Sequence, residues 1–444
     1  AWQKNQGSRE VIVAVIDGGI DYRHEDLSGN VGNPAELFGE PGVDDDGNGY
    51  IDDIYGWNFI NGTNQIEADD HGTHVAGTIG AENNNGVGVC GIAGGHGGNT
   101  GVWLLSCQLF GTIDGREVSA SFPEMIKYAA DAGAVIAQNS WGYENITYLP
   151  RADQEAIDYF IQYAGVDERG EQTGPMKGGV VIFAAGNENK DYRTYPAAYE
   201  KVVSVAAYAP DYKKSWYSNF ADWVDIAAPG GTYGYGRKYN GECPVYSTLP
   251  DNQYGYMQGT SMACPHVSGV AALGLAYAAK TNRHYRAADF VALMKKSVKE
   301  LDSHYQNGAT KTYYMNHTTV GASPEIVQLS KYIGKMGAGL IDAAQLLNNI
   351  KNKELSSDMK LPNVYVGIEK TVSLNLAAYF AGQTEGFSCS VVNGNVASAS
   401  VDGKTLIVKG LAAGSTSLTV TAADGTSQTV VVTVRKSAGN NGWM

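Results

Sequence analysis

The sequence predicts an α/β protein in which helices cover both faces of a mostly parallel sheet, followed by a small all-β sandwich. Two observations carry this prediction. Up to about residue 344, short apolar runs alternate with helical patterns, which is typical of βαβ units. After residue 342 the sequence becomes rich in Val, Thr, Ser and Gly, and its apolar residues alternate with the period of strands that bury one face.

Four apolar runs in the first part are predicted to be strands buried on both faces, because they contain little besides Val, Ile, Ala and Phe. They are VIVAVID (11–17), VIAQNS (135–140), VVIFAAG (180–186) and VVSVAA (202–207). Helical patterns lie between and after them and start near residues 74, 122, 154 and 263. We expect residues 1–350 to fold as one domain around this sheet.

The second part contains four strand-like runs, TVSLNL (371–376), TLIVKGL (405–411), SLTVTA (417–422) and TVVVTV (429–434). The dipeptides Asp402-Gly403 and Asp424-Gly425 lie between such runs and favour hairpin turns. A polar stretch, NNIKNKELSSDMK, separates the two parts. We therefore expect a second domain over residues 357–436.

The composition excludes some classes of partner and favours a secreted protein. The 32 Lys and Arg residues against 46 Asp and Glu give a formal net charge of −14, which repels nucleic acid. High Gly and Tyr contents with only 18% charged residues are common in loop-rich secreted proteins. The chain opens without a charged segment and an apolar core, so a signal peptide is either absent or already removed. We expect an extracellular or cell-surface monomer.

The cysteines show no CxxC pair and no metal-ligand spacing, so we expect free thiols packed as small apolar groups. One disulfide among the first three remains open. The five are Cys90, Cys107, Cys243, Cys264 and Cys389.

Four segments carry the groups that a serine nucleophile needs, namely a hydroxyl, a base, a group that fixes the base, and a donor for the oxyanion. Asp17 ends a buried strand in VIDGGID, where ligand-binding groups emerge from a parallel sheet. In DDHGTHVAG, His71 stands just before a predicted helix. Ser261 starts a helix in GTSMACPHVSGVAA, where the dipole favours negative charge. Asn187 follows a buried strand in FAAGNEN and offers a neutral amide donor.

These segments resemble the subtilisin family of serine proteases, from about residue 7 to 348, where GAGLIDAAQLL resembles the family's closing segment. The order Asp, His, Ser along the chain is also the order in subtilisin. The resemblance implies that Asp17 orients His71, that His71 takes the proton of Ser261, and that Asn187 and the Ser261 backbone N–H form the oxyanion hole. The expected activity is a serine endopeptidase that cleaves polypeptides through an acyl-enzyme.

The resemblance also implies a substrate groove and a supporting residue. Thr260 is expected to hold Asn187 in place. The segment NSWG is expected to pair with the substrate backbone. The end of VVIFAAG is expected to form the floor of the S1 pocket. The residues concerned are Ser140, Trp141 and Gly142, and Ala184, Ala185 and Gly186.

One departure from the family pattern stands beside the catalytic carboxylate. The family usually has Ser or Thr after the catalytic Asp, whereas this chain has Gly18. A hydroxyl that could bond the Asp17 carboxylate is therefore missing. We expect backbone N–H groups to substitute for it and activity to survive.

An acidic loop, GVDDDGNGYIDDIYG, predicts a structural calcium site, because alternating oxygen ligands around glycine turns suit a hard cation. The predicted ligands are Asp44, Asp46, Asn48, Tyr50 and Asp53. Asp26, together with the turn at 83–85, resembles a second calcium site of the family.

The C-terminal part resembles bacterial immunoglobulin-like domains, which implies a spacer or a contact with a surface or carbohydrate. Polypeptide substrates and a cleaved propeptide are the other expected partners. Two alternatives remain open, an inactive binding protein that keeps the fold, and a transpeptidase or peptide cyclase on the same scaffold.

Overall fold

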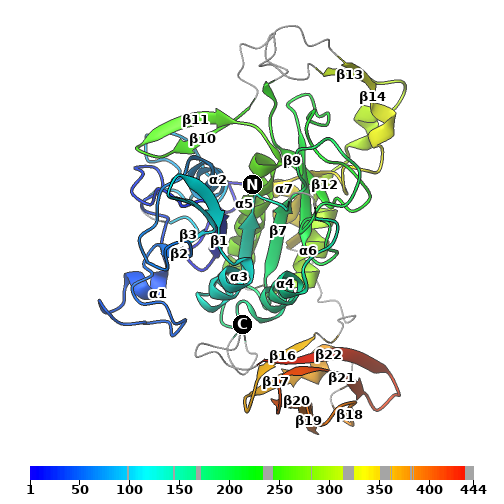
Figure 1. Cartoon of the computed structure of the whole chain (residues 1–444). Coiled ribbons are helices and arrows are strands. Elements are labelled where there is room, and N and C mark those ends of the chain that lie inside the picture. The colour runs from blue at the N-terminus through cyan, green and yellow to red at the C-terminus, as the bar shows by residue number, and fades with distance from the viewer. Residues whose placement is uncertain are drawn as a thin grey trace.

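The computed structural model describes residues 1–97, 100–143, 146–166, 172–233, 244–281, 283–313, 325–350, 361, 363–380, 383 and 385–435. Its centre is a nine-stranded sheet with the order β12-β15-β9-β8-β7-β6-β1-β3-β2 (Figure 1). Adjacent strands pair in parallel except β12 and β15. The strands are β1 Ile12–Asp17, β2 Gly56–Asn58, β3 Trp103–Gln108, β6 Ile136–Asn139, β7 Val180–Ala184, β8 Val203–Tyr208, β9 Ile226–Pro229, β12 Val298–Lys299 and β15 Leu340–Ile341.

Helices cover both faces of this sheet, as predicted. The side chains of β1 alternate between two apolar cores, because successive residues of a strand point to opposite faces. Val13 and Val15 belong to the core that also contains residues of α2 (Asp70–Gly80) and α5 (Thr260–Lys280). Ala14 and Ile16 belong to the other core, with residues of α3 (Phe122–Asp131) and α4 (Arg151–Tyr163). The remaining helices are α1 Pro34–Leu37, α6 Ala287–Lys296 and α7 Ala343–Asn349.

Helix α5 is long and apolar enough to cross a membrane, but 89% of its most apolar window is buried inside the protein. It packs against α2 and against β6 to β9. It is therefore the central core helix of the α/β part.

Three hairpins extend from the α/β part. They are β4 (Phe110–Ile113) with β5 (Arg116–Ser119), β10 (Val245–Leu249) with β11 (Gln253–Met257), and β13 (Thr310–Tyr313) with β14 (Glu325–Gln328). The last pair lies in the stretch before the closing motif, between the short 3-10 helices Asp302–Tyr305 and Leu329–Tyr332.

The C-terminal part is a two-sheet β structure with its own apolar core, drawn in orange and red in Figure 1. One sheet has the order β16-β22-β21-β18 and the other β17-β20-β19. Both predicted Asp-Gly turns connect paired antiparallel strands, β19 with β20 and β21 with β22. The strands are β16 Val364–Gly367, β17 Thr371–Asn375, β18 Ser388–Val391, β19 Ala397–Asp402, β20 Thr405–Gly410, β21 Gly414–Thr421 and β22 Ser427–Arg435, and a 3-10 turn spans Leu376–Ala378.

Hydrogen bonds join the C-terminal part to α4, among them one from the Tyr365 hydroxyl to Asp158 at 3.5 Å. Arg151 donates to the Ser415 hydroxyl at 3.0 Å, and the Tyr365 backbone N–H donates to the Tyr163 hydroxyl at 3.4 Å. Four of the five cysteines, Cys90, Cys107, Cys264 and Cys389, are free thiols, and Cys243 lies outside the described residues.

Candidate active site

Asp17 and His71 are joined by a hydrogen bond at the carboxyl end of β1. His71 Nδ1–H donates to Asp17 Oδ1 at 2.7 Å, and the Gly18 backbone N–H donates to the same oxygen at 2.8 Å. The Asp17 side chain is 2% exposed, whereas that of His71 is 38% exposed. The backbone therefore supplies one donor to the carboxylate, as expected. The other oxygen, Oδ2, is buried without a hydrogen-bond partner among the described residues.

His71 lies inside the first turn of α2, whereas the sequence pattern predicted it just before the helix. Asp69 causes the difference, because its extended backbone and side chain form the N-cap. Its carboxylate accepts hydrogen bonds from the backbone N–H groups of His71 and Gly72, both at 2.9 Å. The cap fixes the backbone from which the imidazole projects.

The electrostatic surroundings favour a proton on His71. Burial opposes the charged imidazolium, but the Asp17 carboxylate in contact with it and the Asp69 carboxylate beyond favour it. Together they raise the pKa of His71 above its ordinary value of 6.5. The same contacts hold the tautomer with the proton on Nδ1, which leaves Nε2 free to accept a proton.

Ser261 is the second residue of α5, directly after Gly259 and Thr260. Gly259 forms the N-cap with φ 153°, a conformation that L side chains rarely adopt. In the structure the Ser261 hydroxyl donates to the Ser140 carbonyl at 3.1 Å. The predicted row of hydrogen bonds is thus formed from Asp17 to His71, and Ser261 points to a different acceptor.

Pro265 explains why Ser140 and Ser261 are linked a second time. Pro265 lies inside α5 and has no N–H to offer the Ser261 carbonyl one turn earlier. The Ser140 hydroxyl takes that place and donates to this carbonyl at 2.7 Å, while Gln138 donates to the Ser140 hydroxyl at 2.7 Å. These bonds tie the start of α5 to the end of β6.

Asn187 lies beside Ser261 and is oriented by Thr260. Its Oδ1 accepts from both the backbone N–H and the hydroxyl of Thr260, each at 2.9 Å. The amide nitrogen is thereby directed away from Thr260. A Cβ built on Gly259 would lie 3.7 Å from Asn187 Nδ2 and 3.4 Å from the Ser261 nitrogen. Both nitrogens thus lie within 4 Å of the same point beside Gly259.

The residues expected to form the substrate groove follow two neighbouring strands. Ser140, Trp141 and Gly142 follow β6, and the Trp141 ring packs edge-on against Phe122 and Phe183 in the core. The remaining three, Ala184, Ala185 and Gly186, lie at the end of β7 and just after it. Sequence reasoning missed Glu188, although it directly follows Asn187. Its carboxylate accepts from Asn219 Nδ2 at 2.6 Å beside Gly186.

The acidic loop folds onto a buried cluster of carboxylates. Oxygens of Glu36, Asp46 and Asp53 lie within 4.8 Å of one another. Asn48 Nδ2 donates to Asp46 at 3.0 Å and to Asp53 at 3.1 Å. Burial raises the pKa of Asp46 to about 7 and also raises the pKa values of Glu36 and Asp53. One oxygen of Asp53 is buried without a hydrogen-bond partner among the described residues.

The other predicted calcium ligands have partners of their own. Asp44 accepts from the backbone N–H groups of Asn48 and Gly49 at the turn, and Tyr50 donates its hydroxyl to Glu124. Asp26 is separate from this loop, and its two oxygens accept from Asn85 Nδ2 at 2.6 Å and from Val89 N at 2.8 Å. Glu36, from α1, was missed, because only the folded chain brings α1 over the loop.

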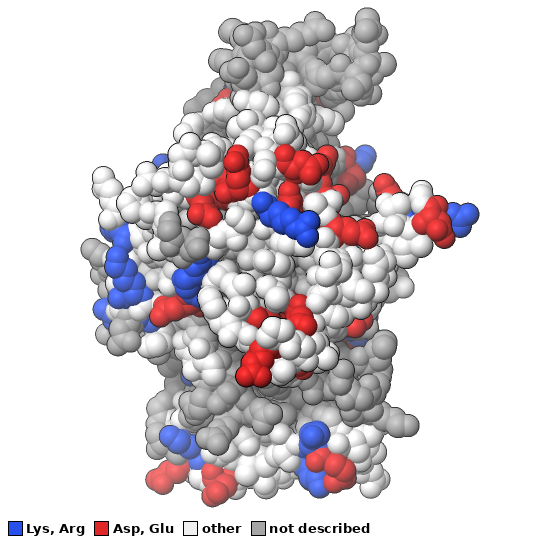
Figure 2. Space-filling view, turned by 90° about the vertical axis from the view of Figure 1, so that its left-hand side faces the viewer, with Lys and Arg blue, Asp and Glu red and all other residues white. Residues whose placement is uncertain are grey.

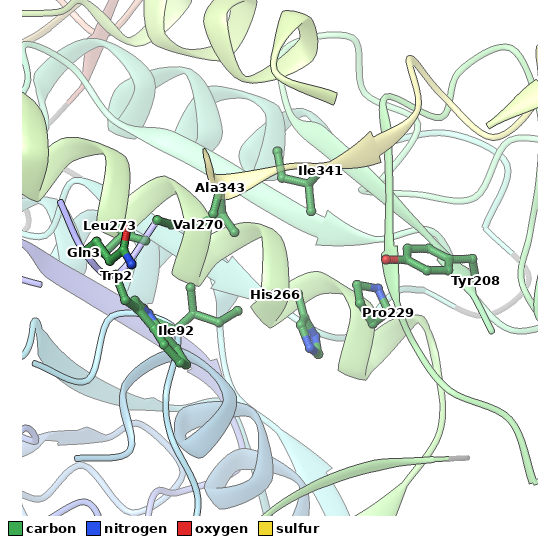
Figure 3. Close-up of a pocket in the computed structure, with 11 residues that line it drawn as sticks. Trp2, Gln3, Ile92, Tyr208, Pro229, His266, Val270, Leu273, Ile341 and Ala343 are labelled. Atoms are coloured by element: carbon green, nitrogen blue, oxygen red, sulfur yellow. The ribbon is translucent and has the colours of Figure 1, made fainter. Parts of the chain in front are cut away.

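A pocket of about 640 Å³ on the other side of α5 contains none of the predicted site residues (Figure 3). Its lining includes Trp2, Ile92, His266 and Ile341. The His266 Nδ1–H donates to the Met262 carbonyl at 2.8 Å, which holds the ring against its own helix. The candidate active site is therefore the edge near Asp17, His71 and Ser261 rather than this pocket.

Comparisons with known proteins identify the family of the α/β part. The model of the subtilase family matches residues 8–324. The chain is 33% identical over 289 residues to the thermophilic serine proteinase of Bacillus sp. (strain AK1), covering 65% of this chain and 57% of that protein. It is 31% identical over 289 residues to thermitase of Thermoactinomyces vulgaris, covering 65% and 82%. With subtilisin-like protease 1 of Plasmodium falciparum it shares 31% identity over 283 residues, covering 59% and 36%.

Solved structures agree on the fold. A lanthipeptide protease superimposes with a TM-score of 0.53 at 22% identity, covering 79% of this chain and 90% of that one. The prenylagaramide maturation protease PagA gives 0.52 at 19% identity, covering 79% and 96%. The matches span about half of the Bacillus relative and a third of the Plasmodium one. Since the family model covers most of the chain, the protein belongs to the subtilase family.

Proposed function

We propose that this subtilase is a serine endopeptidase that cleaves polypeptides through an acyl-enzyme. The observation that carries the proposal is the hydrogen bond from His71 Nδ1–H to the buried Asp17 carboxylate, whose charge also acts on Cys264, three residues after Ser261 on α5. A carboxylate that fixes an imidazole beside a serine hydroxyl is the arrangement that activates a serine nucleophile.

In the proposed reaction, Ser261 turns its hydroxyl from the Ser140 carbonyl to His71 Nε2 when substrate binds. Catalytic hydrogen bonds are often formed only in the substrate complex. His71 takes the proton as Ser261 attacks the carbonyl carbon, and Asp17 stabilises the imidazolium. His71 then returns the proton to the leaving amine, and a water molecule hydrolyses the acyl-enzyme by the same route.

The oxyanion of the tetrahedral intermediate would be held by Asn187 Nδ2 and the Ser261 backbone N–H. Thr260 fixes the carbonyl end of the Asn187 amide with two hydrogen bonds of 2.9 Å, which supports an amide nitrogen oriented before substrate arrives. A donor held in advance needs no reorganisation as charge develops, and this makes it effective.

The peptide backbone would pair with Ser140, Trp141 and Gly142 in an extended conformation. The two hydrogen bonds between Ser140 and Ser261 hold this segment in register with the nucleophile, which supports the assignment. Three small residues after β7, Ala184, Ala185 and Gly186, would leave room for the side chain of the residue before the scissile bond.

Calcium would stabilise the α/β part by binding the buried acidic cluster. Three neighbouring carboxylates, with raised pKa values and an unpartnered buried oxygen among the described residues, fit a hard cation that takes oxygen ligands. Glu36, Asp46, Asn48 and Asp53 are the residues that would hold it. Asp26, with the turn at 83–85, is a second candidate.

We also propose that residues 1–350 and 357–436 are separate domains and that the protein acts outside the cell as a monomer. The separate apolar core of the C-terminal sheets supports the division. Acidic side chains are prominent on the face shown in Figure 2, which fits the absence of nucleic acid among the proposed partners. The proposed partners are polypeptide substrates, a propeptide, and a surface or carbohydrate contact for the C-terminal domain.

Cleavage of a peptide library by the purified chain, analysed by mass spectrometry, tests the activity. We expect internal cleavage by the native protein in calcium buffer and none by Ser261→Ala. Transfer of the acyl group to an added amine in place of water would instead indicate a transpeptidase, and no cleavage of any peptide would contradict the proposal.

A further inference from the structure

Position 18 and Asp69 occupy the same space beside the catalytic carboxylate. A Cβ at position 18 would lie 2.4 Å from Asp69 Oδ2 and 2.6 Å from Asp69 Cβ. A Cβ atom essentially never makes non-bonded contacts this short. A side chain at position 18 and the Asp69 side chain therefore exclude each other. The glycine that departs from the family pattern is therefore required by the aspartate two residues before His71.

Asp69 also brings a second carboxylate to the imidazole. Oxygens of Asp17 and Asp69 and a ring nitrogen of His71 lie within 4.8 Å of one another. Asp17 meanwhile keeps one buried oxygen without a hydrogen-bond partner in the described residues. Asp69 thus stands where a hydroxyl at 18 would approach, and it faces the base instead of bonding the carboxylate.

The charges around His71 can be followed element by element. Asp17 faces it from β1, Asp69 from the turn before α2, and His74 from within α2. Cys264 on α5 faces Asp17. Burial lowers the pKa of His74 to about 4 and raises the pKa of Cys264 to about 12, so both are neutral at the pH of catalysis. Among the described residues, the two carboxylates are the charges that act on the imidazole.

We propose that Asp69 is a positioning residue for the catalytic base, which both caps the helix at His71 and stabilises its imidazolium, and that Gly18 exists to admit it. This inference rests on the proposed function, because it assigns a role to His71 as base. Asp69 acts through His71 and has no direct contact with the reacting atoms in this proposal.

The substitution Asp69→Asn removes the negative charge but keeps the helix cap, because an amide oxygen can still accept hydrogen bonds from the two backbone N–H groups. We expect the acid limb of the kcat/KM profile to move to lower pH by about 0.5 to 1 unit at low salt. The shift should shrink as salt screens the partly exposed carboxylate. Asp70→Asn is the matched control, since it removes the neighbouring exposed charge and should leave the limb in place.

A second pair of variants tests whether a side chain at position 18 and the Asp69 side chain exclude each other. Gly18→Ser alone should displace Asp69 and reduce kcat/KM by at least about tenfold. Asp69→Gly should then cost less in the Gly18→Ser background than in the native protein, because Asp69 has already been displaced there. Thermal melts of each variant separate this effect from misfolding. Full activity of Gly18→Ser with an unchanged pH profile would overturn the proposed exclusion.

An NMR titration of the His71 ring in the same variants needs no turnover. If the native protein cleaves peptides but Asp69→Asn leaves both the acid limb and the ring titration unmoved, the proposed role of Asp69 is wrong while the protease assignment stands. If the native protein neither cleaves peptides nor reacts with a fluorophosphonate at Ser261, the protease assignment fails. The role of His71 as base then fails with it.

Discussion

The pairing of Thr260 with Asn187 gives a prediction whose size follows from the contacts. Thr260→Val keeps the shape of the buried side chain and the backbone N–H bond to Asn187 Oδ1. It removes the hydroxyl bond of 2.9 Å to Asn187, and it also removes the acceptor of the Gly186 backbone N–H at 3.2 Å, whose loss Asn187→Ala does not share. One neutral hydrogen bond contributes about 0.5 to 1.5 kcal/mol. We therefore expect kcat/KM to fall by roughly 2- to 13-fold.

Asn187→Ala should cost far more, because it removes the donor itself. In subtilisin, the loss of one oxyanion donor costs about 2.7 to 4 kcal/mol, or about 10²- to 10³-fold in kcat, and we expect a loss of the same order here. If Thr260 acts only by orienting Asn187, Thr260→Val should cost less than about twofold once Asn187 is Ala, since the two effects are then coupled.

The assay is the hydrolysis of a chromogenic peptide by the four proteins of this cycle, with thermal melts to exclude unfolding. Thr281→Val is the matched control, because the Thr281 hydroxyl makes a hydrogen bond of 2.8 Å to Tyr277 at the far end of the same helix. Equal losses from Thr260→Val in both backgrounds would refute the reasoning.

Three further predictions concern pH, calcium and the C-terminal part. Since His71 must be unprotonated to act as base and its pKa is raised, kcat/KM should fall as the pH drops through a value above 6.5. A fall of kcat/KM that begins only well below pH 6 would contradict this. Asp17→Asn should reduce kcat by about 10⁴-fold. Removal of calcium with EGTA should lower the melting temperature, with about 2.7 kcal/mol lost from a site held at 100 times its Kd; Asp53→Asn should abolish the calcium effect and Asp44→Asn should retain it. Deletion of the residues after 350 should leave peptidase activity intact and change the melting temperature little, because the C-terminal sheets have an apolar core of their own. Aggregation of the truncated chain would argue against independent domains.

The sequence predicted the sheet well, since continuous apolar runs such as 11–17 and 180–186 have few alternatives to a buried parallel strand. The resemblance to the subtilisin family paired Asp17 with His71, and the structure has a hydrogen bond between these two side chains. The first residue of α2 was harder to predict. The Asp69 carboxylate caps the helix and lets it start before the apolar pattern begins.

Other features depend on contacts that no local pattern records. Glu36 joins the acidic cluster from a short helix before the loop, and its spacing from Asp53 carries no signal. In the proposed reaction the hydroxyl of Ser261 changes its acceptor from the Ser140 carbonyl to His71 when substrate binds, and no local sequence pattern records such a change. Pro265 is visible in the sequence, and it leaves the Ser261 carbonyl without its usual N–H donor. That the Ser140 hydroxyl takes this place depends on the fold.

The proposed activity requires that Ser261 is activated by the imidazole that Asp17 orients. Labelling with a fluorophosphonate in calcium buffer, followed by mapping of the modified peptide, tests this requirement without any knowledge of the substrate. We predict a single label on Ser261 that is lost in His71→Ala and whose rate of formation rises with pH through the pKa of His71. Absence of label from the folded native protein, or equal labelling of His71→Ala, would contradict the proposed activation.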